Sequence, residues 1–115
     1  MGGIIYIINV VKTLNHLDDE DKPDIYLFYN KNLEKFLDEF NYPYLKLIQW
    51  NFPDIIKGTL KSILFRKNIF VSGIVEKYSL DAIYPLHDFP VKQKTNTKLI
   101  SWYADLQNKY YPQYF

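Results

Sequence analysis

The sequence predicts an α/β fold, with a mainly parallel sheet flanked by helices. Three observations lead to this prediction. Short apolar runs alternate along the 115 residues with segments whose apolar residues recur at helical spacing. Each run is bounded by Pro, Asn or Asp, which are typical of strand ends. The helical segments lie between successive runs, as crossover connections between parallel strands require.

Composition limits the chain to one domain with one modest core and excludes several classes of protein. Apolar residues make up 48% of the chain, and 14 Lys and Arg stand against 13 Asp and Glu. A net charge of +1 gives no field that would attract nucleic acid, so we predict no nucleic-acid partner. The absence of cysteine excludes a disulfide framework and a thiolate metal site, and is compatible with the cytoplasm.

The first segment, Ile4–Val11, fits two structures. Its β-branched residues favour a strand, whereas a stripe at helical spacing continues beyond it, formed by Ile4, Ile7, Val11, Leu14 and Leu17. We expect a helix from Gly3 to about Leu17. The apolar run is too short to span a bilayer and lacks the flanks of a signal peptide.

Two strand–helix units are expected next. The first strand is Ile25–Tyr29, and Asn30 or Asn32 caps a helix after it, with an apolar stripe at Leu33, Phe36, Leu37 and Phe40. The second strand is Leu45–Trp50. It is followed by a helical period at Ile55, Ile56, Leu60, Ile63 and Leu64.

The last third of the chain repeats the alternation. Asn68 is expected to cap a helix that carries Phe70, Val71, Ile74, Val75 and Tyr78. A short strand is predicted from Asp81 to Tyr84, ended by Pro85. A loop over residues 86–97 leads to a final strand, Lys98–Trp102.

Four groups of residues, in order along nearly the whole chain, resemble the N-terminal half of bacterial family 4 glycosyltransferases. They are Gly2-Gly3 with Tyr6 and Asn9, Lys22-Pro23-Asp24-Ile25, Asp81 to Pro85, and Ser101-Trp102 with Asp105, Gln107, Pro112 and Phe115. The most specific of them is the last, which is similar to a recurring Trp, Asp, aromatic, Gln and His pattern with later Pro and Phe.

The resemblance implies the GT-B architecture, in which two Rossmann-like domains face each other across a cleft. The N-terminal domain mainly holds the acceptor, and the C-terminal domain holds the nucleotide-sugar. Residues 1–115 are then expected to be a single partial N-terminal domain, an incomplete half that lacks the first strand and the donor-binding domain. The missing central strand would expose its neighbours, so we expect two copies to associate as a homodimer.

The implied reaction moves a sugar from a nucleotide-sugar to a hydroxyl of a glycan or lipid-linked acceptor, with retention of configuration. This chain is expected to be inactive alone, and its catalytic residues are unknown. A different class stays open, a non-catalytic interaction or regulatory module that retains the half-domain fold. We predict no cofactor and no metal, because two His and no Cys form no recognisable ligand set.

The substrate-binding residues implied by the resemblance lie at both ends of the chain. Gly2 and Gly3 form a turn before a helix, whose unpaired N–H groups favour a phosphate or a developing anion. Asp105 and Gln107 follow a predicted parallel strand, at the edge where open α/β sheets bind ligands. Asn108 stands where the family usually carries His, and it cannot take a charge near neutral pH.

Structural explanations stay open beside these roles. The glycine pair is equally a flexible start of the chain. Without the resemblance, the preferred explanation is that Asp105 caps the next helix and Gln107 is solvated. His16, near acidic residues, is expected to be a solvated cation at a helix end, and the adjacent His87 and Asp88 suggest no catalytic set.

Basic residues accompany the apolar stripe that follows Pro53, namely Lys57, Lys61, Arg66 and Lys67. Two interpretations stay open. The first is the solvated face of an ordinary packed helix. The second is peripheral contact with an anionic membrane, by a cytoplasmic protein at the inner face of that membrane.

Overall fold

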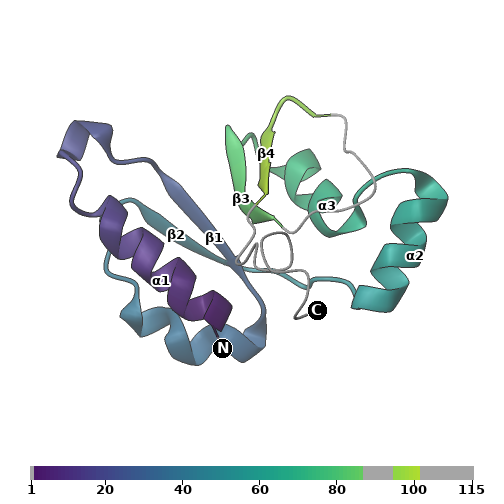
Figure 1. Cartoon of the computed structure of the whole chain (residues 1–115), viewed down its shortest axis with the longest axis horizontal. Coiled ribbons are helices and arrows are strands. Elements are labelled where there is room, and N and C mark those ends of the chain that lie inside the picture. Colours follow the sequence, from purple (N-terminus) through teal and green to yellow (C-terminus); the bar gives the residue numbers. More distant parts are fainter. Residues whose placement is uncertain (1, 87–94, 102–115) are drawn as a thin grey trace, which may run out of the picture. The chain divides into compact units, whose positions relative to one another are not determined.

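The computed structural model describes residues 2–86 and 95–101, which belong to two compact units (Figure 1). The first unit comprises Met1–Phe52 and the second Pro53–Phe115, and each is described by itself. The predicted α/β class is confirmed in its mixture of helices with parallel strands. In the described ranges the strands form two separate parallel pairs, not one Rossmann-like sheet.

The first unit is built on a pair of parallel strands, β1 (Ile25–Tyr29) and β2 (Leu45–Gln49). Their register sets Ile25 opposite Leu45 and Tyr29 opposite Gln49. Helix α1 (Gly2–Leu14) and the short 3-10 turn η1 (Asp19–Asp21) precede the strands, and η2 (Lys31–Glu39) connects them. The first strand has the predicted bounds, and the second ends one residue earlier than predicted.

The expected helix in the first segment is confirmed, although it ends at Leu14 instead of Leu17. Ile8 and Val11 are 4% and 3% exposed, one turn apart on the same side of α1. This side buries two of the β-branched residues that suggested a strand, whereas Ile5 is 52% exposed. After Leu14 the chain turns out of the helix, and Leu17 N donates a backbone hydrogen bond to Leu14 O.

The segment between the two strands is a continuous 3-10 helix, where an α-helix was expected. Its predicted cap is confirmed, because the Asn30 side chain accepts a hydrogen bond from Asn32 N at 3.0 Å. Side chains three residues apart align along a 3-10 helix. The apolar pairs Leu33/Phe36 and Leu37/Phe40 have this spacing, so the tighter helix keeps each pair on one side.

The second unit begins with two helices, α2 (Ile55–Phe65) and α3 (Ile69–Lys77). Asp54 caps α2, and Asn68 caps α3 as predicted, accepting from Phe70 N at 3.1 Å. Arg66 ends α2 in the left-handed conformation, with φ of 55°. The tight turn between the helices brings Ser62 Oγ within 3.0 Å of Ile69 N, which donates to it.

The strands of the second unit, β3 (Ala82–Leu86) and β4 (Lys98–Ser101), also pair in parallel. The prediction that Pro85 ends β3 is wrong, because the strand continues through it to Leu86, with a cis Tyr84–Pro85 peptide. Proline lacks an N–H group for the ladder, and the register shifts between Ile83 and Leu86. Trp102, the predicted end of the last strand, lies outside the described residues.

Each unit has its own small set of buried side chains. They are Ile8, Val11 and Tyr42 in the first, and Val71 and Ile74 with the polar Ser62, Asn68, Ser72 and Thr97 in the second. Within the described ranges, every buried side-chain nitrogen and oxygen has a hydrogen-bond partner. The helices of those ranges include none with both the length and the apolar character needed to cross a membrane.

Candidate functional site

A cavity of about 520 Å³ lies beside β1 in the first unit. Three elements line it, through Gly3, Ile4 and Ile7 of α1, Leu27, Phe28 and Tyr29 of β1, and Asn32, Leu33, Lys35, Phe36 and Leu37 of η2 with the adjacent Phe40. Pockets that bind small molecules usually measure roughly 300–1,000 Å³. The cavity is therefore large enough for a ligand the size of one or two sugar rings.

The cavity lies where open α/β sheets bind their ligands. Tyr29 is the last residue of β1, Asn32 lies in the first turn of η2, and Gly3 lies in the first turn of α1. The site therefore combines the carboxyl end of a parallel strand with the N-terminal turns of two helices. The first N–H groups of a helix have no partner inside that helix.

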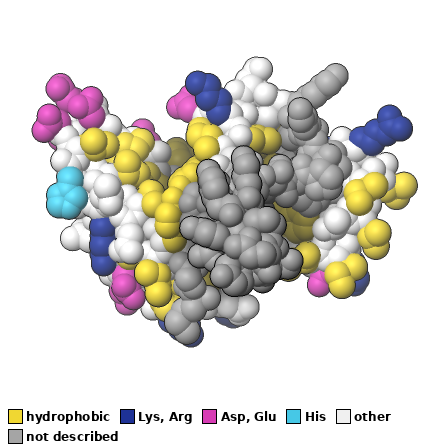
Figure 2. Space-filling view, in the orientation of Figure 1, with side chains coloured by type: hydrophobic (Ala, Val, Ile, Leu, Met, Phe, Trp, Pro, Cys, Tyr) yellow, Lys and Arg dark blue, Asp and Glu magenta, His cyan; other side chains and the backbone are white. Residues whose placement is uncertain are grey.

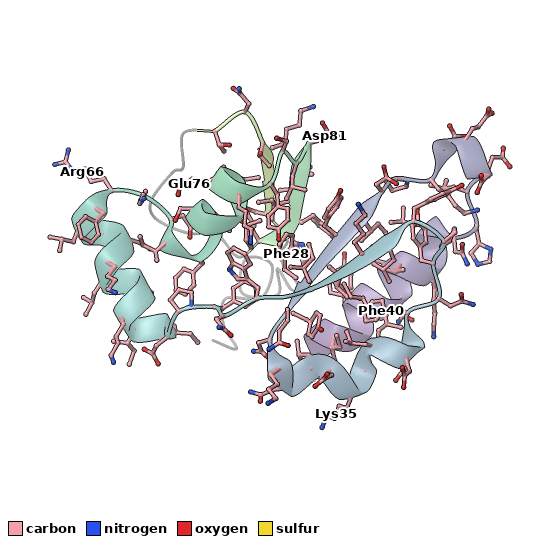
Figure 3. The ribbon with its side chains drawn as sticks, turned by 180° about the vertical axis from the view of Figure 1, so that it is seen from behind. Phe28, Lys35, Phe40, Arg66, Glu76 and Asp81 are labelled. Atoms are coloured by element: carbon pink, nitrogen blue, oxygen red, sulfur yellow. The ribbon has the colours of Figure 1, made fainter. Side chains whose placement is uncertain are left out.

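The cavity lining is mostly apolar, with few polar side chains. Asn32, Lys35 and Tyr29 carry its side-chain hydrogen-bonding groups. Lys35 Nζ lies 5.1 Å from the centre of the Phe36 ring, and its ammonium group points away from the strands (Figure 3). No carboxylate or imidazole belongs to the described lining, so what this site offers is binding and positioning rather than acid–base chemistry.

The two glycines of the expected site form the start of α1 itself, not a turn before it. A Cβ placed on Gly3 would meet no atom within 4 Å. Packing of the chain therefore does not require glycine at this position, although glycine weakens a helix. Because Gly3 has no side chain, the space beside it at the edge of the cavity is open.

The other expected site residues fall into two groups. Asp105, Gln107 and Asn108 lie outside the described residues, as do His87 and Asp88. His16 is exposed and follows the end of α1. Across residues 2–86 and 95–101, no three His, Asp or Glu side chains come together in a way that could hold a metal ion.

Sequence reasoning missed the part of the lining that comes from β1 and η2. The signal was present, because the predicted strand, half-buried in the structure, ends at Tyr29 directly before an Asn cap, and this combination marks the ligand edge of a parallel sheet. The stripes of α1 and η2 were predicted only as the apolar sides of two separate helices. In the structure, Ile4 and Ile7 of one helix and Leu33 and Phe36 of the other line the same cavity.

Two tyrosines next to β2 are hydrogen-bonded to the segment that precedes β1. Tyr44 donates a hydrogen bond of 2.6 Å to Asp19 Oδ2, which raises the pKa of Tyr44 above 10.0. Tyr42 donates to Pro23 O at 2.7 Å, and burial, with Asp24 and Asp19 nearby, raises its pKa as well. Both hydroxyls are engaged within the fold, so we assign them a structural role.

Comparisons of the chain with protein families, with curated proteins and with solved structures find no match. Its function is therefore inferred from its own residues and from the geometry of the cavity.

Proposed function

We propose that the chain supplies the acceptor side of a glycosyltransferase, as part of a Rossmann-like half of a GT-B enzyme. The reaction moves a sugar from a nucleotide-sugar to a hydroxyl of a glycan or lipid-linked acceptor. The observation that carries the proposal is the cavity beside the carboxyl half of β1, lined also by α1 and η2. The sequence resemblance supports it independently.

The described residues suit the binding of an acceptor that joins a sugar ring to an apolar chain. The lining is mostly apolar, with Ile7 and Phe36 among its members, and Asn32 adds a polar side chain. Holding the acceptor hydroxyl in one orientation lowers the entropic part of the barrier. Stabilisation of the departing nucleotide is assigned to a donor-binding domain, so the chain alone performs no transfer.

Backbone NMR titration with two probes tests the proposal. Octyl β-glucoside, kept below its micelle concentration, represents a sugar with an apolar chain, and we expect saturable shifts at Leu27, Tyr29 and Leu33. UDP-glucose represents the donor, and we expect weak, non-saturating shifts near Gly3. The variant Leu33→Ser should weaken octyl glucoside binding, because it removes an apolar wall of the cavity.

Lys12→Gln is a suitable control, since Lys12 is exposed on α1 and does not line the cavity. Tight, saturable binding of UDP-glucose would assign the donor to this chain and contradict the acceptor-side role. Absence of octyl glucoside shifts at the cavity would also contradict it.

One observation favours the second candidate, a non-catalytic interaction module. Helix α2 exposes a row of large apolar side chains. A module of this kind would use α2 without any sugar binding at the cavity, and the octyl glucoside titration separates the two candidates.

A further inference from the structure

Helix α2 buries its small residues and exposes its large apolar ones. Gly58 and Ser62 are buried, and Ser62 is 0% exposed. Six large apolar residues of the same helix are exposed by more than half. Two are its first and last residues, Ile55 at 77% and Phe65 at 62%, and the other four share one side of the helix: Ile56 at 72%, Leu60 at 64%, Ile63 at 56% and Leu64 at 76%. These four residues are called the α2 outer face below. Ordinary surface helices of globular proteins show the opposite arrangement.

The α2 outer face is one continuous surface opposite the packed side. At about 100° per residue, its four side chains fall within an arc of about 100°, centred opposite Gly58 and Ser62. Figure 2 shows hydrophobic side chains gathered over α2 at the right of the view. The arc contains no side chain with a hydrogen-bonding group.

All charged side chains of α2 are positive. Lys57 and Lys61 are exposed and adjoin the arc on its Leu64 side, and α2 contains no Asp or Glu. Exposed Arg66 extends outward from the end of the helix (Figure 3). The nearest carboxylate in sequence, Asp54, accepts hydrogen bonds from Ile56 N and Lys57 N at 3.0 and 3.2 Å.

We propose that α2 docks on the surface of an anionic lipid bilayer, with the α2 outer face in the acyl-chain boundary and Lys57, Lys61 and Arg66 at the headgroups. An apolar face bordered by lysines is the pattern of helices that lie in a membrane interface. The lysine stems extend along the apolar surface while their ammonium groups reach the anionic headgroups. This inference stands on α2 alone and does not depend on the proposed function.

The length of α2 fixes its orientation on the membrane. Its 11 residues measure about 16 Å at about 1.5 Å per residue. A hydrocarbon core is about 30 Å thick, so the helix lies along the surface and does not cross it.

The chemistry of the face favours lipid over a protein partner. Protein interfaces concentrate their binding energy in Trp, Tyr and Arg anchors and use polar groups to fix orientation. The α2 outer face consists of Leu and Ile without a polar group, which suits a non-directional hydrocarbon environment. Antiparallel pairing of two copies through this face would bring their Lys57 and Lys61 side chains close together, with no acidic residue on either α2 to offset them.

Vesicle co-sedimentation of the full chain tests the proposal. The unmodified protein should bind vesicles of phosphatidylcholine with phosphatidylglycerol, bind pure phosphatidylcholine vesicles at least tenfold more weakly, and dissociate as salt is raised. The variant Leu60→Ser/Leu64→Ser should lower the partition coefficient at least tenfold. Lys57→Gln/Lys61→Gln should lower it by about fivefold per lysine on the anionic vesicles.

The matched control is Lys12→Gln/Lys31→Gln, which removes the same charge from exposed positions of the first unit and should bind as the unmodified protein does. Circular dichroism should show equal helix content in all variants, because every substituted side chain is exposed. Failure of the unmodified protein to bind anionic vesicles would overturn the proposal, as would binding that Leu60→Ser/Leu64→Ser leaves unchanged. Self-association without vesicle binding, abolished by the same variant, would assign the face to a second copy and overturn it too.

Discussion

Gly58 of α2 lies directly against the aromatic ring of Phe70 of α3. A Cβ placed on Gly58 would stand 2.6 Å from Cζ of that ring and 2.8 Å from Cε1. The absent side chain therefore creates the space in which the ring packs, and this contact joins the two helices. Any larger residue at position 58 must displace Phe70 or move the helices apart.

Gly58→Ala should destabilise the second unit for this reason. Overpacking costs about 1–3 kcal/mol, and the better helix propensity of Ala returns about 1 kcal/mol, so we expect a net loss of up to about 2 kcal/mol. Urea denaturation followed by circular dichroism measures it. Gly3→Ala is the control, since no atom lies within 4 Å of the added Cβ, and stability should stay the same or rise. A Gly58→Ala protein as stable as the control would contradict the packing argument.

Ser62→Ala should also destabilise the turn between α2 and α3. The Ser62 hydroxyl donates to Gly58 O at 2.7 Å and accepts from Ile69 N at 3.0 Å. Its removal leaves the Ile69 N–H without that acceptor, at a cost of about 1–3 kcal/mol. Thr59→Ala removes a hydroxyl that donates only to Ile55 O in the same helix, and should change stability by less than about 0.5 kcal/mol. Hydrogen exchange at Ile69 should accelerate in the first variant alone, and equal exchange in both would refute this role.

The cap at Asp54 predicts a ranking of two variants. Asp54→Ala removes the acceptor of the Ile56 and Lys57 N–H groups and should cost about 1 kcal/mol. Asp54→Asn keeps an acceptor but loses the charge near the helix N-terminus. It should therefore lower the free energy of unfolding by about 0.3–1 kcal/mol, which is no more than Asp54→Ala does. Thermal melting measures both. A larger loss in Asn than in Ala would contradict the capping role.

Alkaline pH should destabilise the first unit through Tyr44. Its folded pKa lies above the 10.0 of the unfolded chain, mainly because its hydroxyl donates to Asp19. The stabilisation is fully present below pH 10.0 and is lost as the pH rises through the folded pKa, since the unfolded state releases its proton first. Asp19→Asn should bring the titration of Tyr44 closer to that of a free tyrosine, as seen in tyrosinate absorption. An unchanged titration in Asp19→Asn would exclude Asp19 as the cause.

The local structure of the chain was largely predictable from its residues. Ile25–Tyr29 forms the predicted strand because a β-branched and aromatic run is bounded by Pro and Asn. The cap at Asn68 followed from the preference of its side chain for the first free N–H groups of a helix. The helix at Ile4–Val11 followed from a stripe that extends beyond the β-branched run, which tertiary packing favours over propensity.

Features that depend on packing between elements were not predictable in the same way. For the stripe of α2 two interpretations were left open, a packed helix and contact with a membrane. The structure exposes the stripe, because Gly58 and Ser62 give α3 a closer approach on the other side. Periodicity identifies an apolar side of a helix but does not say what covers it. The strand through Pro85 depends on a register shift that no local signal announces. The cavity could not be predicted either, because it depends on how α1, β1 and η2 are placed relative to one another.

The parallel strand pairs also have a consequence for the order of folding. Each pair joins segments close together in the sequence, Ile25 with Leu45 and Ala82 with Lys98, and each is completed within its own unit. The entropy lost in closing such short loops is modest compared with that for strands from distant parts of a chain. Formation of one pair does not require the other to exist first. During synthesis, the N-terminal pair has all of its residues available while the C-terminal strands are still being translated, so the two units acquire their β-structure in succession.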